Sequence, residues 1–166
     1  METVTDVPPA PRPEPSRRLA EAARGLWTIG ALGWALPLAI GVPLVLGGID
    51  EVPGALRALA IVGAVLVAAV GALAVPQLRW RRWRWDVRDE EIDLRHGALT
   101  EVRTIVPMAR VQHVDVRRSF MQQRSGTADL VVHTAAGQTT IPMLPEAAAV
   151  EVRDRIADLA RTPDEL

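Results

Sequence analysis

Two long runs without a charged residue dominate the first half of the chain. They extend from Gly25 to Ile49 and from Ala58 to Leu78. An α-helix rises about 1.5 Å per residue and the hydrocarbon core of a bilayer is about 30 Å thick, so each run is long enough to cross a membrane. The pattern therefore predicts a transmembrane helical hairpin over residues 25–78.

After the second run the hydrophobic pattern changes to short stretches in which apolar and polar residues alternate. Such alternation is typical of strands with one buried face. We expect six strands, at 83–88, 91–96, 101–107, 111–117, 127–134 and 138–143, with an irregular or helical connection at 119–124. From Pro145 the apolar residues fall on one helical face instead, at Ala149, Val152, Ile156 and Leu159. Residues 79–162 are thus predicted to form a small β-rich domain, a bent antiparallel sheet or partial barrel with a C-terminal capping helix.

The segment before the hairpin, residues 1–24, is rich in proline and poor in apolar residues. We expect it to be a disordered cytoplasmic tail. Arginines cluster on both flanks of the hairpin, whereas the connection Asp50–Arg57 holds only one. The positive-inside rule then places both termini in the cytoplasm and the short connection outside. The chain is expected to be a multi-pass protein of a bacterial plasma membrane.

Composition excludes several classes of protein. The chain has 166 residues and no cysteine, which rules out a disulfide scaffold, a thiolate metal site and a cysteine nucleophile. Its 19 basic residues are all arginine and nearly balance 20 acidic residues, so a dedicated nucleic-acid binder is not expected. The two apolar runs hold no ionisable group, which argues against a transporter, a channel or an intramembrane protease.

Arginine and tryptophan alternate directly after the second run. Tryptophan rings prefer the headgroup layer, where arginine meets lipid phosphates. We expect an anchor at the membrane interface, with specific lipid recognition as an alternative, formed by Arg79, Trp80, Arg81, Arg82, Trp83, Arg84 and Trp85.

Small residues recur at four-residue spacing along the second run. Such a row lets helix backbones approach closely, either the first run of the same chain or another copy. Abundant alanine alone would also produce it. The row consists of Ala60, Ala64, Ala68 and Ala72.

The sequence lacks the residue patterns that are typical of catalytic sites. His96, His113 and His133 show no helical spacing and no carboxylate cluster that would make a metal site, so we expect them to be strand-surface or satisfied core residues. There is no nucleophile motif and no glycine-rich phosphate loop. The sequence predicts no enzyme, no cofactor, no metal and no small-molecule substrate.

The stretch from Val106 to Val116, VPMARVQHVDV, resembles the bacterial pleckstrin-homology (PH) domain membrane proteins, the YdbS-like group. The resemblance covers roughly residues 20–160 and departs from the family at Arg124-Ser125, where an apolar step is usual. A PH-like barrel also has seven strands, and a seventh would lie within 110–119 or be absent. The motif residues are Pro107, Arg110, Gln112, His113 and Gly126.

This resemblance implies a PH-like fold that binds lipid headgroups, peptides or proteins rather than catalysing a reaction. We therefore expect a membrane-anchored binding or adaptor module at the inner leaflet. A protein is the preferred partner, and a lipid headgroup is the second candidate. The partners of the module would be membrane lipids and a membrane-associated protein or a second copy, without nucleic acid. The alternative is an accessory subunit of a larger membrane enzyme or transporter, docked through its transmembrane helices.

Overall fold

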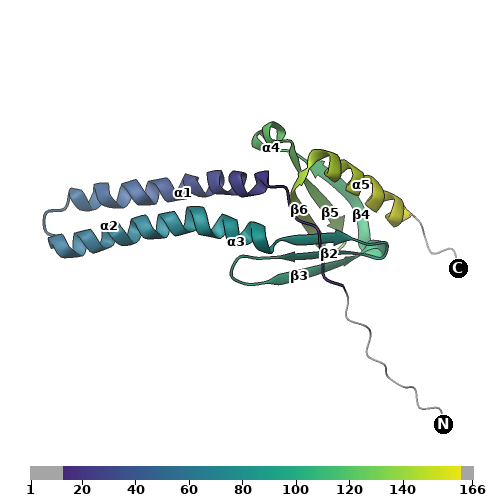
Figure 1. Ribbon diagram of the computed structural model, residues 1–166, viewed down its shortest axis with the longest axis horizontal. Helices are drawn as coiled ribbons and strands as arrows, with labels where there is room; N and C mark the ends of the chain where they lie inside the picture. Colours follow the sequence, from purple (N-terminus) through teal and green to yellow (C-terminus); the bar gives the residue numbers. More distant parts are fainter. Residues whose placement is uncertain (1–12, 162–166) are drawn as a thin grey trace, which may run out of the picture.

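A helical hairpin projects from a β-rich domain in the computed structural model, which describes residues 13–161 (Figure 1). Helix α1 spans Ala22–Gly47. The second arm is one continuous helix of 29 residues, formed by α2 (Gly54–Ala69), one π-helical turn η1 (Val70–Ala74) and α3 (Val75–Arg82). Both arms are long and apolar enough to cross a membrane, as the two uncharged runs predict.

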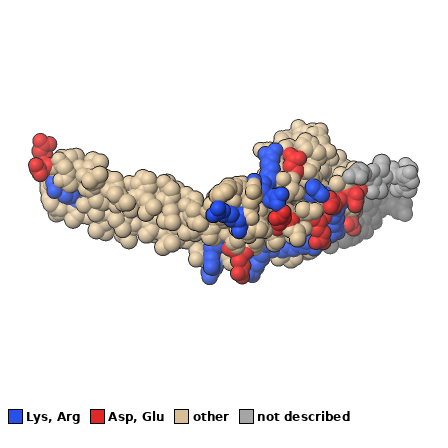
Figure 2. Space-filling view, turned by 90° about the horizontal axis from the view of Figure 1, so that it is seen from above, with Lys and Arg blue, Asp and Glu red and all other residues tan. Residues whose placement is uncertain are grey.

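Small side chains bring the two arms together. Ala35 of α1 is buried against Ala68 and Ala72 of the second arm. The ring of Trp34 lies on Gly71, where an added Cβ atom would come within 2.1 Å of the ring. The outward faces of the arms are apolar, and Figure 2 shows charged side chains at the tip of the hairpin and over the domain, with the length between them free of charge. This surface suits a lipid environment.

The domain contains six strands, as predicted, but they form two three-stranded antiparallel sheets rather than one continuous bent sheet. A short 3-10 turn, η2 (Met108–Arg110), separates the sheets. Proline at position 107 has no N–H to continue the ladder, which suits a break at this point. Helix α4 (Phe120–Ser125) fills the predicted connection. The strands are β1 (Arg84–Val87), β2 (Glu91–His96) and β3 (Val102–Pro107), then β4 (Val111–Arg117), β5 (Thr127–Thr134) and β6 (Gly137–Pro145).

One core joins the two sheets and the C-terminal helix α5 (Glu146–Arg161). Ile92 and Leu94 from the first sheet meet Leu130 and Ile141 from the second. Ile156 of α5 completes this fully buried set, and α5 covers the open side of the second sheet (Figure 1). The predicted capping helix is therefore confirmed. Within residues 13–161 the region 110–119 holds only β4, so it does not conceal a seventh strand.

The expectation of a disordered tail over residues 1–24 is wrong for residues 13–24. Residues 1–12 lie outside the described part of the chain. Arg17 and Trp85 exchange two backbone hydrogen bonds of 3.1 and 3.0 Å, so the segment lies beside β1. Leu19 and Ala23 are buried in the domain core. Composition did not reveal this, because backbone pairing to a strand needs no run of apolar side chains. Both ends of the hairpin are thus attached to the same domain.

The burial of Trp85 gives a first test of the shared core. Trp85→Ala should lower the free energy of unfolding by about 3–5 kcal/mol, as for other buried tryptophans replaced by alanine. Denaturation of the full chain in detergent, followed by far-UV circular dichroism, measures this. Leu99→Ala, at a side chain that is 89% exposed, should change it by less than about 0.5 kcal/mol. Equal effects of the two substitutions would contradict the assignment of Trp85 to the core.

Gly71 offers a matched test of the hairpin. Gly71→Leu should displace Trp34 and destabilise the hairpin by about 1–3 kcal/mol, the usual cost of overpacking. Gly63→Leu adds the same side chain where nothing lies within 4 Å. The Gly63→Leu variant should resist unfolding by a denaturing detergent as well as the unmodified chain does. A Gly63 variant as sensitive as the Gly71 variant would show that the Trp34 contact does not hold the arms.

Candidate functional site

The arginine–tryptophan stretch after the second run is divided between two environments. Helix α3 includes Arg79–Arg82, and β1 begins two residues later. Trp83 and Trp85 are only 5% and 3% exposed and belong to the domain core. The prediction that these two rings lie in the headgroup layer is therefore wrong. The reason is that strand alternation begins at once after the helix and turns Trp85 and Val87 inward.

The remaining aromatic residues connect the hairpin to the domain. Trp80 donates a hydrogen bond from Nε1 to the carbonyl oxygen of Ala20 at 3.0 Å. The Trp83 ring stacks on His96 at 4.6 Å between centroids and lies 6.2 Å from the ring of Trp27. Burial, followed by the positive charge of Arg79, lowers the pKa of His96 and favours its neutral form.

A hollow of roughly 520 Å³ lies where the second arm enters the domain. Its wall contains more cationic than anionic side chains. Arg95 donates to Glu14 at 2.9 Å and to Glu101 at 2.8 Å, so part of the charge is neutralised. The lining residues are Glu14, Pro15, Arg81, Arg82, Arg84, Arg95 and Glu101.

The register of the first sheet concentrates this positive charge. Arg84 of β1 is directly opposite Arg95 of β2, and Arg95 is directly opposite Arg103 of β3. Like charges in facing positions destabilise a sheet. Burial, and then the charges of Arg18 and Arg95, lower the pKa of Arg84. An anion in the hollow would relieve this repulsion.

Arg81 differs from the other arginines of the hollow. Arg82 donates to the carbonyl oxygen of Ala98 at 2.6 Å, and Arg84 donates to those of Arg81 and Trp83. Among residues 13–161 the Arg81 guanidinium has no hydrogen-bond partner. It is the cation of this group that is available to a ligand.

The β2–β3 loop lies on the side of the domain that faces the hairpin (Figure 1). Arg82, which lines the hollow, donates a hydrogen bond to Ala98 in this loop. Gly97 adopts φ 127°, and an added Cβ atom would lie 1.8 Å from the carbonyl oxygen of Thr100, so only glycine fits there. The tight turn exposes Leu99 at 89%. An apolar side chain is thus presented next to a cationic hollow.

The family-motif residues do not line this hollow. Pro107 and Arg110 border a smaller cavity of roughly 220 Å³ between β3 and the start of β6. Gln112 and His113 are exposed on β4, and Gly126 ends α4 in the left-handed conformation with φ 65°. The motif marks turns and strand positions around the junction of the two sheets.

The alanine row packs within the chain. Ala68 and Ala72 are buried against α1, while Ala64 is partly exposed and Ala60 is exposed. The buried half of the row therefore contacts the first arm of the same chain, which is one of the two partners expected from the sequence.

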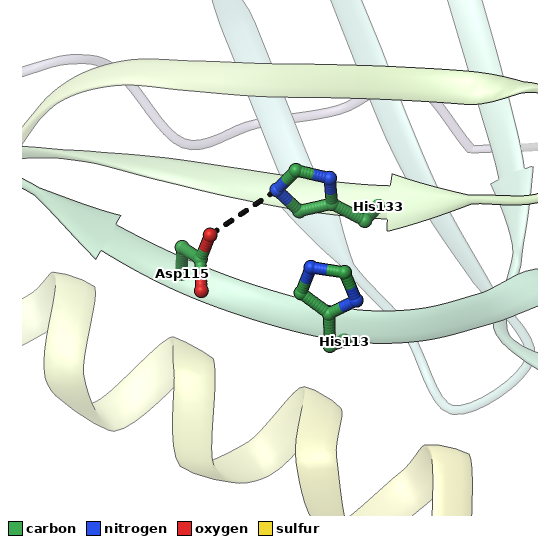
Figure 3. A group of neighbouring side chains, drawn as sticks. All are labelled: His113, Asp115 and His133. Carbon is green, nitrogen blue, oxygen red and sulfur yellow. Dashed lines mark ion pairs between the residues drawn. The ribbon is translucent and has the colours of Figure 1, made fainter.

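Two of the three histidines lie together with a carboxylate, contrary to expectation. Figure 3 shows His113 and Asp115 on β4 beside His133 on β5, with an ion-pair contact between His133 and Asp115. The sequence pattern could not show this, because it depends on the pairing register of two strands. The potential ligand atoms of the three side chains lie within 4.8 Å of one another.

The chain is similar to a known protein family and to one relative. A family model described as "Bacterial PH domain" matches residues 29–160. The "UPF0699 transmembrane protein YdbS" of Bacillus subtilis is 34% identical over 114 residues, which covers 69% of this chain and 69% of that protein. No solved structure matches.

The Arg95–Glu101 pair gives a titration test of the hollow. The hydrogen bond from Arg95 holds the pKa of Glu101 below its ordinary value. The stability that this carboxylate contributes is therefore present at neutral pH and is lost as the pH falls through the lowered pKa. Arg95→Gln should raise the pKa of Glu101 toward its ordinary value. Titration of the Glu101 side-chain carboxyl carbon by NMR in micelles measures this.

The control for that titration is Arg110→Gln, which removes the same charge from the η2 turn. It should leave the Glu101 titration unchanged. A Glu101 pKa that does not respond to Arg95→Gln, or that responds equally to both variants, would show that the pair does not form in solution.

Proposed function

Because this chain belongs to the bacterial PH domain family and carries two helices able to cross a membrane, we propose that it is a membrane-anchored, non-catalytic binding module. Its ligand in this proposal is an anionic headgroup of the membrane that holds it. The observation that carries the proposal is the arginine hollow at the end of the second arm.

Helix length supports a position of the hollow at the depth of the headgroups. The uncharged stretch 58–78 fills the hydrocarbon core at about 1.5 Å per residue. The last turn of α3 then lies in the headgroup layer with Arg79, Arg81 and Arg82. Arg81 and Arg82 line the hollow, so a lipid phosphate can reach it without leaving the bilayer surface. Leu99, exposed on the adjoining loop, would contact the acyl boundary.

The orientation follows from the same features. Arg17 pairs with Trp85, so the chain on the two sides of the hairpin meets at one end of the molecule. Arginines are concentrated at this end, whereas the connection at the far tip holds Arg57 with Asp50 and Glu51. The positive-inside rule therefore supports a domain and termini on the cytoplasmic side of the plasma membrane, with the tip outside.

The test uses the full chain in micelles that contain equal amounts of anionic phosphatidylglycerol and zwitterionic phosphatidylcholine. Native mass spectrometry then counts the lipids retained. Each arginine near the surface contributes about 1 kcal/mol to anionic lipid binding, so Arg81→Gln with Arg84→Gln should weaken retention roughly thirtyfold. Arg81→Gln alone, which breaks no hydrogen bond of its side chain within residues 13–161, should show part of the effect.

The matched control is Arg117→Gln with Arg153→Gln, which removes two charges from β4 and α5. Its lipid retention should equal that of the unmodified chain. Equal losses in the two double variants, or no preference for the anionic lipid, would contradict headgroup binding. An acidic protein segment would then be the remaining partner for the hollow.

A further inference from the structure

Strand pairing brings three potential metal ligands onto one face of the second sheet. His113 and Asp115 are two residues apart on β4 and so point to the same side. His133 on β5 is directly opposite His113 and diagonal to Asp115. Their neighbours Val114 and Val132 turn into the core, so the three side chains lie on the opposite, outer face. This site is separate from the arginine hollow.

The side chains are close enough to share one ion. The rings of His113 and His133 stack with centroids 4.1 Å apart and planes 12° from parallel. Asp115 Oδ2 lies 3.2 Å from His133 Nε2. His113 is exposed, whereas Asp115 and His133 are half-buried, so an ion would reach the site from solvent (Figure 3).

One polar atom of this group lacks a hydrogen-bond partner. The Nε2 atom of His133 is inaccessible to solvent and forms no hydrogen bond within the described residues, although it lies 3.2 Å from Asp115 Oδ2. A cation bound between His133 Nε2 and Asp115 Oδ2 would give this nitrogen a partner, while the carboxylate of Asp115 also accepts a hydrogen bond from Arg117 at 3.4 Å.

We infer that His113, Asp115 and His133 form a binding site for a divalent transition-metal ion of the zinc type. Two imidazole nitrogens and one carboxylate oxygen are the ligands that such ions prefer, whereas Ca²⁺ and Mg²⁺ require mostly oxygen ligands. Zinc bonds of about 2 Å place tetrahedral ligands roughly 3.3 Å apart. Small side-chain rotations bring atoms now within 4.8 Å to that spacing.

Three protein ligands leave one coordination position open. In zinc proteins an open position is occupied by water or by an incoming ligand, whereas closed structural sites have four protein ligands. The outer face of the sheet leaves this position accessible to solvent. The ion would also join β4 to β5 through side chains, in addition to their backbone ladder.

The experiment measures zinc binding by the full chain in detergent, purified without a histidine tag and treated with a chelator. Isothermal titration should give one Zn²⁺ per chain. His113→Gln, His133→Gln and Asp115→Asn should each weaken binding at least about tenfold, since each removes one of three ligands. Substitution by Co²⁺ should add visible absorption bands characteristic of tetrahedral coordination.

His96→Gln is the matched control, because His96 is the third histidine of the chain and lies against Trp83 in the first sheet. It should leave the stoichiometry and affinity unchanged. Absence of saturable one-to-one Zn²⁺ binding, or an equal loss in His96→Gln, would overturn the inference. The result is independent of lipid retention, which depends on the arginine hollow.

Discussion

The membrane hairpin and the β-rich domain share one hydrophobic core, and the rest of the structure depends on this connection. Helix α3 passes directly into β1, and Trp83 and Trp85 are buried with Leu130 and Ile156. On the other arm, Ala23 at the start of α1 is buried in the same core. A chain with a flexible linker would let the domain rotate over the bilayer. Here the buried contacts at both ends of the hairpin fix the domain relative to the two helices that are long and apolar enough to cross a membrane.

This rigid connection gives the arginine register its significance. Arginines face one another on three neighbouring strands. Glu14 and Glu101 pair with Arg95, and Asp93 pairs with Arg103, whereas Arg84 donates only to backbone carbonyl oxygens within the described residues. Arg84 begins β1 two residues after the end of α3, so the unpaired charge lies where the second arm joins the domain. In the proposed function, a lipid phosphate would balance this charge.

Sequence patterns predicted the elements better than their arrangement. Runs without charge and strict alternation depend on neighbouring residues, so the hairpin, the six strands and the capping helix could be foreseen. Contacts between distant segments could not. Leu19 looked like part of a tail because its partners lie beyond the hairpin. Trp85 looked interfacial because of the alternating arginines and tryptophans, although the same residues were also predicted to begin a strand. The neighbours of Arg95 and His133, Arg84 and His113, are set by strand register, which no local pattern specifies.

The pairing of Arg17 with Trp85 has a consequence for biosynthesis. Arg17 leaves the ribosome before the first membrane segment, and its partner follows only after the second. If both segments cross the membrane, this pairing beside β1 can form only after both have been inserted and the chain has returned to the side on which it started. Insertion of a single segment would leave the two halves of this pair on opposite sides of the bilayer, so correct assembly of the domain reports correct insertion of the hairpin.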